Sequence, residues 1–247
     1  MKKINNNTFT LFGINNSIAI LKSKKFNIIN IDLMENSRAL KEKKIELLIE
    51  DEKINRMNKN QFNQKYLEKR SQGISITFSG DIIRKEIPSF ENQENACLLV
   101  LDQVEDPQNF GQIIRTAECA GIDGIVFPKH HSAPINETVL QVSQGAFVNM
   151  PIYEVVNIRN VFKQFKSDGF WLIGIENSIH AKPWFDIKYG GKTIIVLGSE
   201  GKGIRKMVLE SCDFKSTIPM KGKINSLNVS ATASAILFER LRQLEGN

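Results

Sequence analysis

Residues 196–208 read "VLGSEGKGIRKMV", and this stretch decides how the second half of the chain folds. The apolar run that ends in it, "TIIVLG" (193–198), is typical of a buried strand and passes directly into a turn with Gly198, Gly201 and Gly203. Glycine allows backbone amides and carbonyls to approach a ligand closely. A strand that ends in such a turn indicates the ligand-binding edge of an α/β domain.

Around this stretch, short apolar runs alternate with helical patterns. We expect strands at 97–101, 124–127, 170–175 and 215–220, and helices at 111–120 and about Val229–Leu244. Buried strands that alternate with helices predict a parallel sheet covered on both faces. No glycine pattern of a dinucleotide-binding fold follows the first of these strands, and "GGKT" (190–193) precedes a strand instead of a helix. Neither nucleotide-binding signature is therefore supported.

The first half of the chain is rich in lysine and asparagine and predicts a small α/β domain. We expect a helix after Gly13, a strand at 29–33, a helix at 37–50, and strands at 53–57 and 73–78. Residues 79–95 combine a Gly, a Pro and many charges with little periodicity, as linkers do. The predicted organisation is a first domain at 1–80, a linker at 81–94 and a second domain at 95–247.

Composition sets limits on the function. The chain has 247 residues, 41% of them hydrophobic, and a formal charge of +6, which fits a polyanionic partner without requiring one. Cys97, Cys119 and Cys212 lie far apart, and with three histidines they give no zinc-binding spacing, so we expect no metal. Because no signal peptide or membrane-length apolar run is present, we expect a soluble cytoplasmic protein without a membrane partner.

Two further stretches carry turn chemistry at strand ends: "NFGQIIRTAECAG" (109–121) and "IPMKGKINSLNVSATASAILFERL" (218–241). Each has an ordinary structural interpretation when taken singly. Ser226 or Asn228 could cap the last helix, and Arg115 could be a solvated helix residue. If all three stretches had only this structural role, three independent strand ends would have to mimic one pattern in the same order.

In this order the three stretches resemble the motifs of the SpoU (TrmH-like) branch of the SPOUT RNA methyltransferases, over residues 95–247. Residues 1–80 resemble the L30e-like RNA-binding domain in front of the bacterial 23S rRNA members, although Ser71 stands where a histidine is common. The resemblance implies a trefoil knot, with the segment after Ile218 threaded through a loop. It also implies a homodimer whose two active sites lie at the subunit interface.

The same resemblance implies S-adenosylmethionine-dependent methylation of the ribose 2′-hydroxyl of a guanosine in 23S rRNA. The residues that it places in the catalytic centre are Asn109, Arg115, Glu200, Ser226 and Asn228. Those that it places around the cofactor, mostly through their backbone, are Gly198, Ser199, Gly203, Ile218, Met220 and Leu227. Because a guanidinium keeps its proton up to about pH 12, we expect Arg115 to clamp a phosphate and orient the ribose, and the general base stays open.

Other functions remain open at this point. The chain could methylate the ribose of a tRNA guanosine or of an rRNA adenosine, since target choice depends on loop details. A catalytically silent RNA-binding protein of ribosome assembly is an alternative of another class. It predicts the loss of Arg115, Glu200 or Asn228, and all three are present.

Overall fold

The computed structural model describes residues 8–49, 54–66, 71–178 and 181–246. By its internal contacts the chain divides into two units. Unit 1 comprises Met1–Ile82 and Ile135–Val148, and unit 2 comprises Ile83–Pro134 and Asn149–Asn247. Residues 135–148 therefore fold with the first unit, although they follow the first strands of the second along the chain. The domain limits given above, with their L30e-like and catalytic assignments, stay a prediction.

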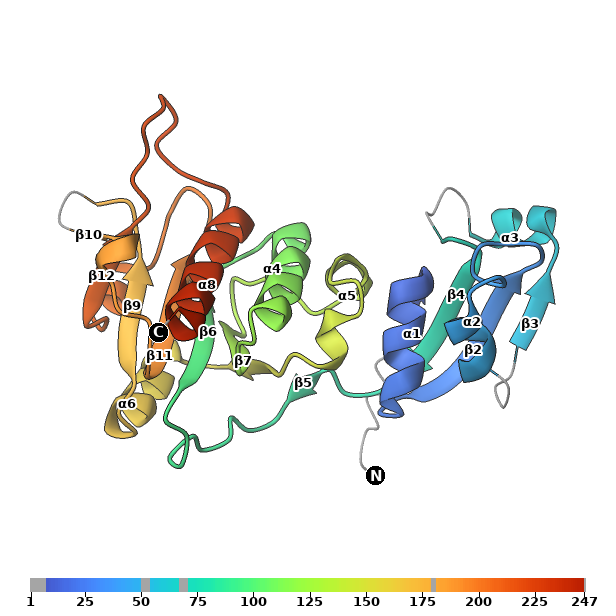
Figure 1. The fold of residues 1–247 in the computed structure, drawn as a ribbon, viewed down its shortest axis with the longest axis horizontal. Helices are drawn as coiled ribbons and strands as arrows, with labels where there is room; N and C mark the ends of the chain where they lie inside the picture. The colour runs from blue at the N-terminus through green and yellow to red at the C-terminus, as the bar shows by residue number, and fades with distance from the viewer. Residues whose placement is uncertain (1–7, 50–53, 67–70, 179–180, 247) are drawn as a thin grey trace. The chain divides into compact units, whose positions relative to one another are not determined.

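Within the described residues, unit 1 is built on a four-stranded sheet in the order β1-β4-β2-β3 (Figure 1). Its strands are β1 (Thr8–Phe12), β2 (Asn27–Met34), β3 (Ile54–Met57) and β4 (Ile74–Ser79). Strand β4 runs antiparallel to β1 and β2, whereas β2 and β3 are parallel. The helices are α1 (Ile14–Ser23), α2 (Lys43–Leu48), α3 (Lys59–Lys65) and α5 (Glu137–Val142), with a short 3₁₀ helix η1 (Ala146–Val148).

Side chains of α5 make hydrogen bonds to the backbone of the edge strand β1. Glu137 Oε1 accepts a hydrogen bond from the Thr10 amide at 2.6 Å, and Gln141 Oε1 accepts one from the Phe12 amide at 2.8 Å. Gln141 Nε2 also donates to the Phe12 carbonyl at 3.0 Å. The two side chains lie one helical turn apart and satisfy backbone groups that an edge strand would otherwise expose. This explains why residues 135–148 belong to unit 1.

One prediction for unit 1 needs correction, and two elements of this unit were not predicted. The predicted helix 37–50 is reduced to α2, because residues before it form turns: the Ala39 amide donates to the Gln72 carbonyl at 3.1 Å and the Leu40 amide to Ser37 Oγ at 3.2 Å. Residue 50 lies outside the described part. Strand β1 and helix α3 were not predicted. The strands at 29–33 and 73–78 and the helix after Gly13 are confirmed.

Unit 2 contains the predicted parallel sheet. In the part of the chain that the structure describes it has eight strands in the order β10-β12-β9-β11-β6-β7-β8-β5, and neighbouring strands are parallel throughout. The strands are β5 (Ile83–Arg84), β6 (Ala96–Asp102), β7 (Gly124–Pro128), β8 (Ile152–Val155), β9 (Trp171–Ile175), β10 (Lys182–Pro183), β11 (Lys192–Gly198) and β12 (Phe214–Thr217). Short β5 lies inside the stretch predicted as a linker.

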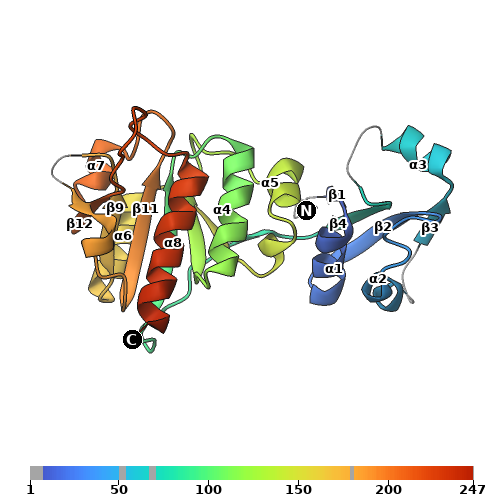
Figure 2. The same ribbon diagram turned by 45° about the horizontal axis from the view of Figure 1, so that its top comes forward.

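Helices cover both faces of this sheet. Helices α4 (Pro107–Cys119) and α8 (Val229–Glu245) lie side by side on one face (Figures 1 and 2). Helix α6 (Ile158–Ser167) packs on the sheet through Phe162 and Phe165, which share a buried cluster with Leu98 and Val100 of β6. The remaining helical segments are α7 (Lys206–Leu209) and the 3₁₀ helix η2 (Trp184–Asp186).

The predicted elements of unit 2 differ mainly at their ends. Helix α4 begins four residues before the predicted start, because the side chain of Asp106 caps it by accepting from the Gln108 amide at 2.9 Å and Pro107 suits a first helical position. Strand β12 ends at Thr217, and the predicted strand residues 218–220 belong to the loop that leads to α8. The predicted trefoil knot stays a prediction.

The described residues contain no helix long and apolar enough to cross a membrane. They also contain no group of three or more His, Cys, Asp and Glu residues that could hold a metal ion.

Candidate active site

The glycine turn after β11 is as tight as the sequence indicates. The Ser199 amide donates to the Gly203 carbonyl at 3.2 Å, and the Gly203 amide donates to the Ser199 carbonyl at 3.0 Å. A Cβ atom on Gly198 would lie 2.1 Å from the carbonyl carbon of Gly203, so no larger residue fits there. Gly201 has a φ of 80°, in the left-handed region that favours glycine. Glu200 lies within this turn.

An ion pair between a buried aspartate and an exposed arginine fixes the end of the turn to the neighbouring strand. Asp102, the last residue of β6, is fully buried. Its Oδ2 accepts from the Arg205 amide at 2.8 Å, and its Oδ1 accepts from Arg205 Nε at 2.8 Å and lies 2.7 Å from a terminal guanidinium nitrogen. This pair was not predicted from the sequence. An aspartate that ends an apolar strand and an arginine directly after the glycine turn were the available signal.

Helices α4 and α8 each bring an asparagine to the same edge of the sheet. Asn109 lies in the first turn of α4 and is buried. Asn228 is the N-cap of α8, where its Oδ1 accepts from the Ser230 amide at 2.8 Å. The capping interpretation of Asn228 is therefore confirmed, and its other amide atom remains available for a second contact.

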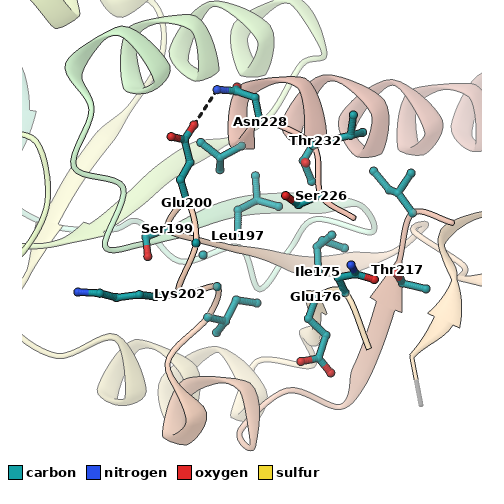
Figure 3. Close-up of a pocket in the computed structure, with 18 of the residues that line it drawn as sticks. Ile175, Glu176, Leu197, Ser199, Glu200, Lys202, Thr217, Ser226, Asn228 and Thr232 are labelled. Atoms are coloured by element: carbon teal, nitrogen blue, oxygen red, sulfur yellow. Dashed lines mark hydrogen bonds between the residues drawn. The ribbon is translucent and has the colours of Figure 1, made fainter. Parts of the chain in front are cut away.

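Asn109, Glu200 and Asn228 form one hydrogen-bonded group, which we call the amide–carboxylate cluster. Glu200 Oε1 accepts from Asn109 Nδ2 at 2.7 Å and from Asn228 Nδ2 at 2.7 Å. Asn228 Nδ2 also lies 3.0 Å from Asn109 Oδ1, to which it donates. Figure 3 shows the contact between Asn228 and Glu200 above the cavity. Since both bonds end on Oε1, Glu200 Oε2 has no donor from the described part of the chain.

Two further residues support the cluster and were not predicted. Ser230 Oγ lies 2.6 Å from Asn228 Oδ1 and 2.8 Å from Gln112 Oε1. Together with the Ser230 amide, this hydroxyl fixes which way the Asn228 amide group faces. Spacing along α4 and α8 gives no signal for a contact between residues 118 positions apart.

The cluster borders a cavity of about 740 Å³. Its walls are the turn after β11 and the loop between β12 and α8. The lining includes all six predicted cofactor residues, Gly198, Ser199, Gly203, Ile218, Met220 and Leu227, and three of the predicted catalytic residues, Glu200, Ser226 and Asn228. Sequence reasoning missed Glu176, Asn177 and Thr217, which line the cavity from the ends of β9 and β12.

The structure brings four of the five predicted catalytic residues together and leaves one apart. Asn109 does not line the cavity but is joined to it through Glu200 and Asn228. Arg115 is exposed on α4, does not line the cavity, and makes no ion pair with the described residues. It shares one exposed face of the helix with Gln108, Gln112 and Cys119.

Comparisons with known structures support the fold. The structure resembles a crystal structure of an RNA 2′-O ribose methyltransferase (TM-score 0.80, 20% identity, covering 97% of this chain and 90% of that one). It also resembles the SpoU methyltransferase AviRb from Streptomyces viridochromogenes in complex with the cofactor AdoMet (TM-score 0.77, 20% identity, covering 97% and 91%). At this level of identity, the two comparisons establish the α/β fold with its parallel sheet.

Sequence comparisons establish the family. The chain is 36% identical over 227 residues to an uncharacterized tRNA/rRNA methyltransferase of Borreliella burgdorferi, covering 87% of this chain and 99% of that protein. It is 40% identical over 146 residues to a protein of Staphylococcus saprophyticus named as a TrmH family tRNA/rRNA methyltransferase, and this match spans 58% of the staphylococcal protein. Residues 96–238 match the model of the SpoU rRNA methylase family. The chain therefore belongs to the SpoU rRNA methylase family.

Proposed function

We propose that the chain transfers the methyl group of S-adenosylmethionine to the ribose 2′-hydroxyl of a guanosine in 23S rRNA. The observation that carries this proposal is the amide–carboxylate cluster. It joins one residue from each of the three stretches that resemble the family motifs, with contacts of 2.7–3.0 Å at the border of the cavity. Membership of the SpoU family supports the reaction class.

The cavity residues fit S-adenosylmethionine. Ile175, Leu197, Ile218 and Leu227 supply apolar walls, and Leu227 remains 45% exposed, so a planar base would cover apolar surface there. The hydroxyl of Ser199 is buried and has no hydrogen-bond partner in the described residues, so it is available to a ligand. AdoMet is the cofactor in the AviRb structure and is bound in the rRNA methyltransferase structure from Sinorhizobium meliloti. When bound, it supplies a methyl group on a positively charged sulfur, which is already activated toward an oxygen nucleophile.

The chain's own residues would hold and activate the ribose. A ribose hydroxyl is a poor nucleophile at neutral pH, so the site must place it and help to remove its proton. The open Oε2 of Glu200 is an acceptor in a fixed position, because two amide donors hold the other oxygen. Ser226 lines the same cavity and offers a further hydroxyl. We assign these residues to ribose placement and leave the identity of the general base open.

A second copy of the chain would complete the site. Arg115 does not reach the cavity of its own chain, and it lies on an exposed face of α4. Helix α8, which packs beside α4, exposes Phe238 by 47%. A homodimer through these helices would cover this apolar side chain and bring Arg115 to the partner's cavity, where it would clamp an RNA phosphate.

The two-unit organisation supports rRNA as the substrate. The rRNA methyltransferase structure from Sinorhizobium meliloti covers 96% of this chain, whereas the tRNA-modifying enzyme from A. aeolicus covers 63%. The alternatives are a tRNA guanosine, an rRNA adenosine, or binding of RNA without catalysis. We also infer that residues 1–80 bind the RNA and that the protein acts in the cytoplasm.

Methyl transfer to a panel of RNAs tests this proposal. The chain is incubated with methyl-labelled S-adenosylmethionine and with unmodified, protein-free 23S rRNA, 16S rRNA or tRNA, and with large-subunit particles that are still assembling. We expect label on 23S rRNA or on the particles that contain it. Label on tRNA would support the proposed methyl transfer but would show that the substrate is tRNA and not 23S rRNA. Bound cofactor without label on any RNA would favour the catalytically silent alternative.

A further inference from the structure

A second polar region of the cavity lies away from the amide–carboxylate cluster. Glu176 follows β9, and Thr217 ends the neighbouring strand β12. Both line the cavity, and Figure 3 shows them on the other side of it from Glu200 and Asn228. We call Glu176, Asn177 and Thr217 the polar corner. No part of the reaction described above uses it.

The backbone of the polar corner is fixed. The Glu176 amide donates to the Ser216 carbonyl at 2.9 Å, which extends the pairing between β9 and β12 by one step. Asn177 Nδ2 donates to the carbonyl of Asn225, in the loop that forms the opposite wall. The Glu176 side chain therefore starts from a defined position at the carboxyl edge of the sheet.

The carboxylate of Glu176 differs from that of Glu200 in its contacts. Glu200 accepts two hydrogen bonds from asparagine amides. Glu176 is half-buried, and its carboxylate has neither an ion pair nor a hydrogen bond within the described residues. A partly desolvated carboxylate without a donor is costly, so a ligand that brings hydroxyl donors to it would gain free energy.

We propose that Glu176 recognises the cofactor, and that its carboxylate accepts hydrogen bonds from the ribose hydroxyls of the adenosine part. This inference rests on the proposed function. A carboxylate has two oxygens, which match two vicinal hydroxyls, and an acidic residue that holds ribose hydroxyls is a known solution in nucleotide-binding α/β domains. The cluster on the other side of the cavity remains free to receive the RNA ribose.

Binding of two cofactor fragments to the full-length chain tests this assignment. S-Adenosylhomocysteine contains both the ribose and the amino-acid part, whereas 5′-methylthioadenosine keeps the ribose and lacks the amino acid. Neither compound carries the sulfonium charge, so the loss of a negative charge at residue 176 has less general electrostatic effect on their binding. Dissociation constants are measured by calorimetry, or by competition with labelled S-adenosylhomocysteine, for the wild type, Glu176→Gln and the control Glu154→Gln. Glu154 is exposed on β8 and does not line the cavity.

We expect Glu176→Gln to weaken the binding of both compounds by about tenfold, and Glu154→Gln to leave both unchanged. A thermal melt of each variant checks that folding is retained. Unchanged binding by Glu176→Gln would overturn the assignment. Weaker binding of S-adenosylhomocysteine with normal binding of 5′-methylthioadenosine would also overturn it, because the carboxylate would then hold the amino group. A wild-type chain that binds neither compound would contradict the proposed function itself, and the assignment with it.

Discussion

Two carboxylates, one in each unit, show how a structural group differs from a candidate functional one. In unit 1, Asp32 is fully buried, and both of its oxygens are occupied: Oδ1 accepts from Asn55 at 2.9 Å, and Oδ2 accepts from Lys65 at 2.8 Å and from the Tyr66 hydroxyl. In unit 2, Glu200 is exposed, and the chain supplies donors to one of its oxygens. A carboxylate that the chain leaves half satisfied is available to a substrate.

The cations differ in the same way. Lys65 makes an ion pair with Asp32 at 2.8 Å inside its own unit. Arg115 is exposed and makes no ion pair with any described residue. The charges of Asp32 and Lys65 are therefore matched within one chain. Among the described residues, Glu200 Oε2 has no donor and Arg115 has no ion-pair partner, so both are available to groups of another molecule. We expect substitutions in the first set to change stability and those in the second to change turnover.

The largest effect is expected for Arg115→Ala. If Arg115 clamps a phosphate at the site, its loss removes a preorganised positive charge, and kcat should fall by about 10³-fold. Because the side chain is exposed, the melting temperature and S-adenosylhomocysteine binding should not change. Arg159→Ala is the matched control, since Arg159 is exposed on α6, does not line the cavity and makes no ion pair with the described residues. A normal rate for Arg115→Ala would contradict its role.

Glu200→Gln should have the next largest effect. The amide retains the shape of the side chain but places a neutral group between Asn109 and Asn228, and it removes the charged acceptor from the cavity. We expect kcat to fall by roughly 10²-fold with little change in stability. Single-turnover kinetics with saturating RNA and cofactor measure this step. If stability fell as far as activity, Glu200 would be a structural group like Asp32.

Asp32→Asn should reverse this pattern. The substitution leaves Lys65 without its counter-ion and weakens the hydrogen bonds that join α3 to the sheet, so we expect a loss of about 1–3 kcal/mol in the free energy of unfolding. Scanning calorimetry measures the change, with the exposed Asp81→Asn as control. The kcat of the folded variant should stay normal. If kcat fell although the variant remained fully folded, Asp32 or its partners in unit 1 would take part in the reaction.

The smallest effect is expected in the pH dependence of stability. Burial by itself raises the pKa of the Asp32 carboxyl, but hydrogen bonds from Lys65, Tyr66, Asn30 and Asn55 outweigh it and hold the pKa below its ordinary value of 3.8. The ionised form is therefore favoured by folding. Its stabilising contribution is fully present above the unfolded pKa and is lost as the pH falls through the folded pKa.

Denaturant titrations at several pH values between neutral and strongly acidic test this linkage. Below the ordinary pKa of the carboxyl, the wild type should lose stability more steeply than Asp32→Asn. Equal slopes for the two proteins would mean that the Asp32 pKa is not lowered by folding.

Sequence patterns predicted many of the features that depend on local spacing, although helices α3 and α6 were not predicted. The parallel sheet of unit 2 and its helices α4 and α8 follow from apolar runs and helical periodicity, and the structure confirms them. The resemblance also selected residues that meet: Asn109, Glu200 and Asn228 lie within hydrogen-bonding distance. Strand ends were less accurate, because caps and turns depend on single side chains such as that of Asp106.

Features that depend on distant contacts could not be predicted. The association of residues 135–148 with unit 1 rests on bonds such as that between Glu137 and Thr10, 127 positions apart. Likewise, Glu176 enters the cavity because β9 and β12 are neighbours, which the order of strands along the chain does not reveal. Arg115 is exposed away from the cavity because of the way α4 is rotated about its axis. Helical periodicity alone does not show which face of α4 turns toward the cavity.

Identification of the methylated nucleoside is the decisive test of ribose methylation by this chain. RNA labelled by the wild-type chain is digested to nucleosides, and the labelled product is identified by chromatography and mass spectrometry. We expect 2′-O-methylguanosine, from a single position of 23S rRNA that becomes resistant to alkaline cleavage. Label on a base would contradict the assigned chemistry, because the amide–carboxylate cluster would then hold a group other than the ribose hydroxyl.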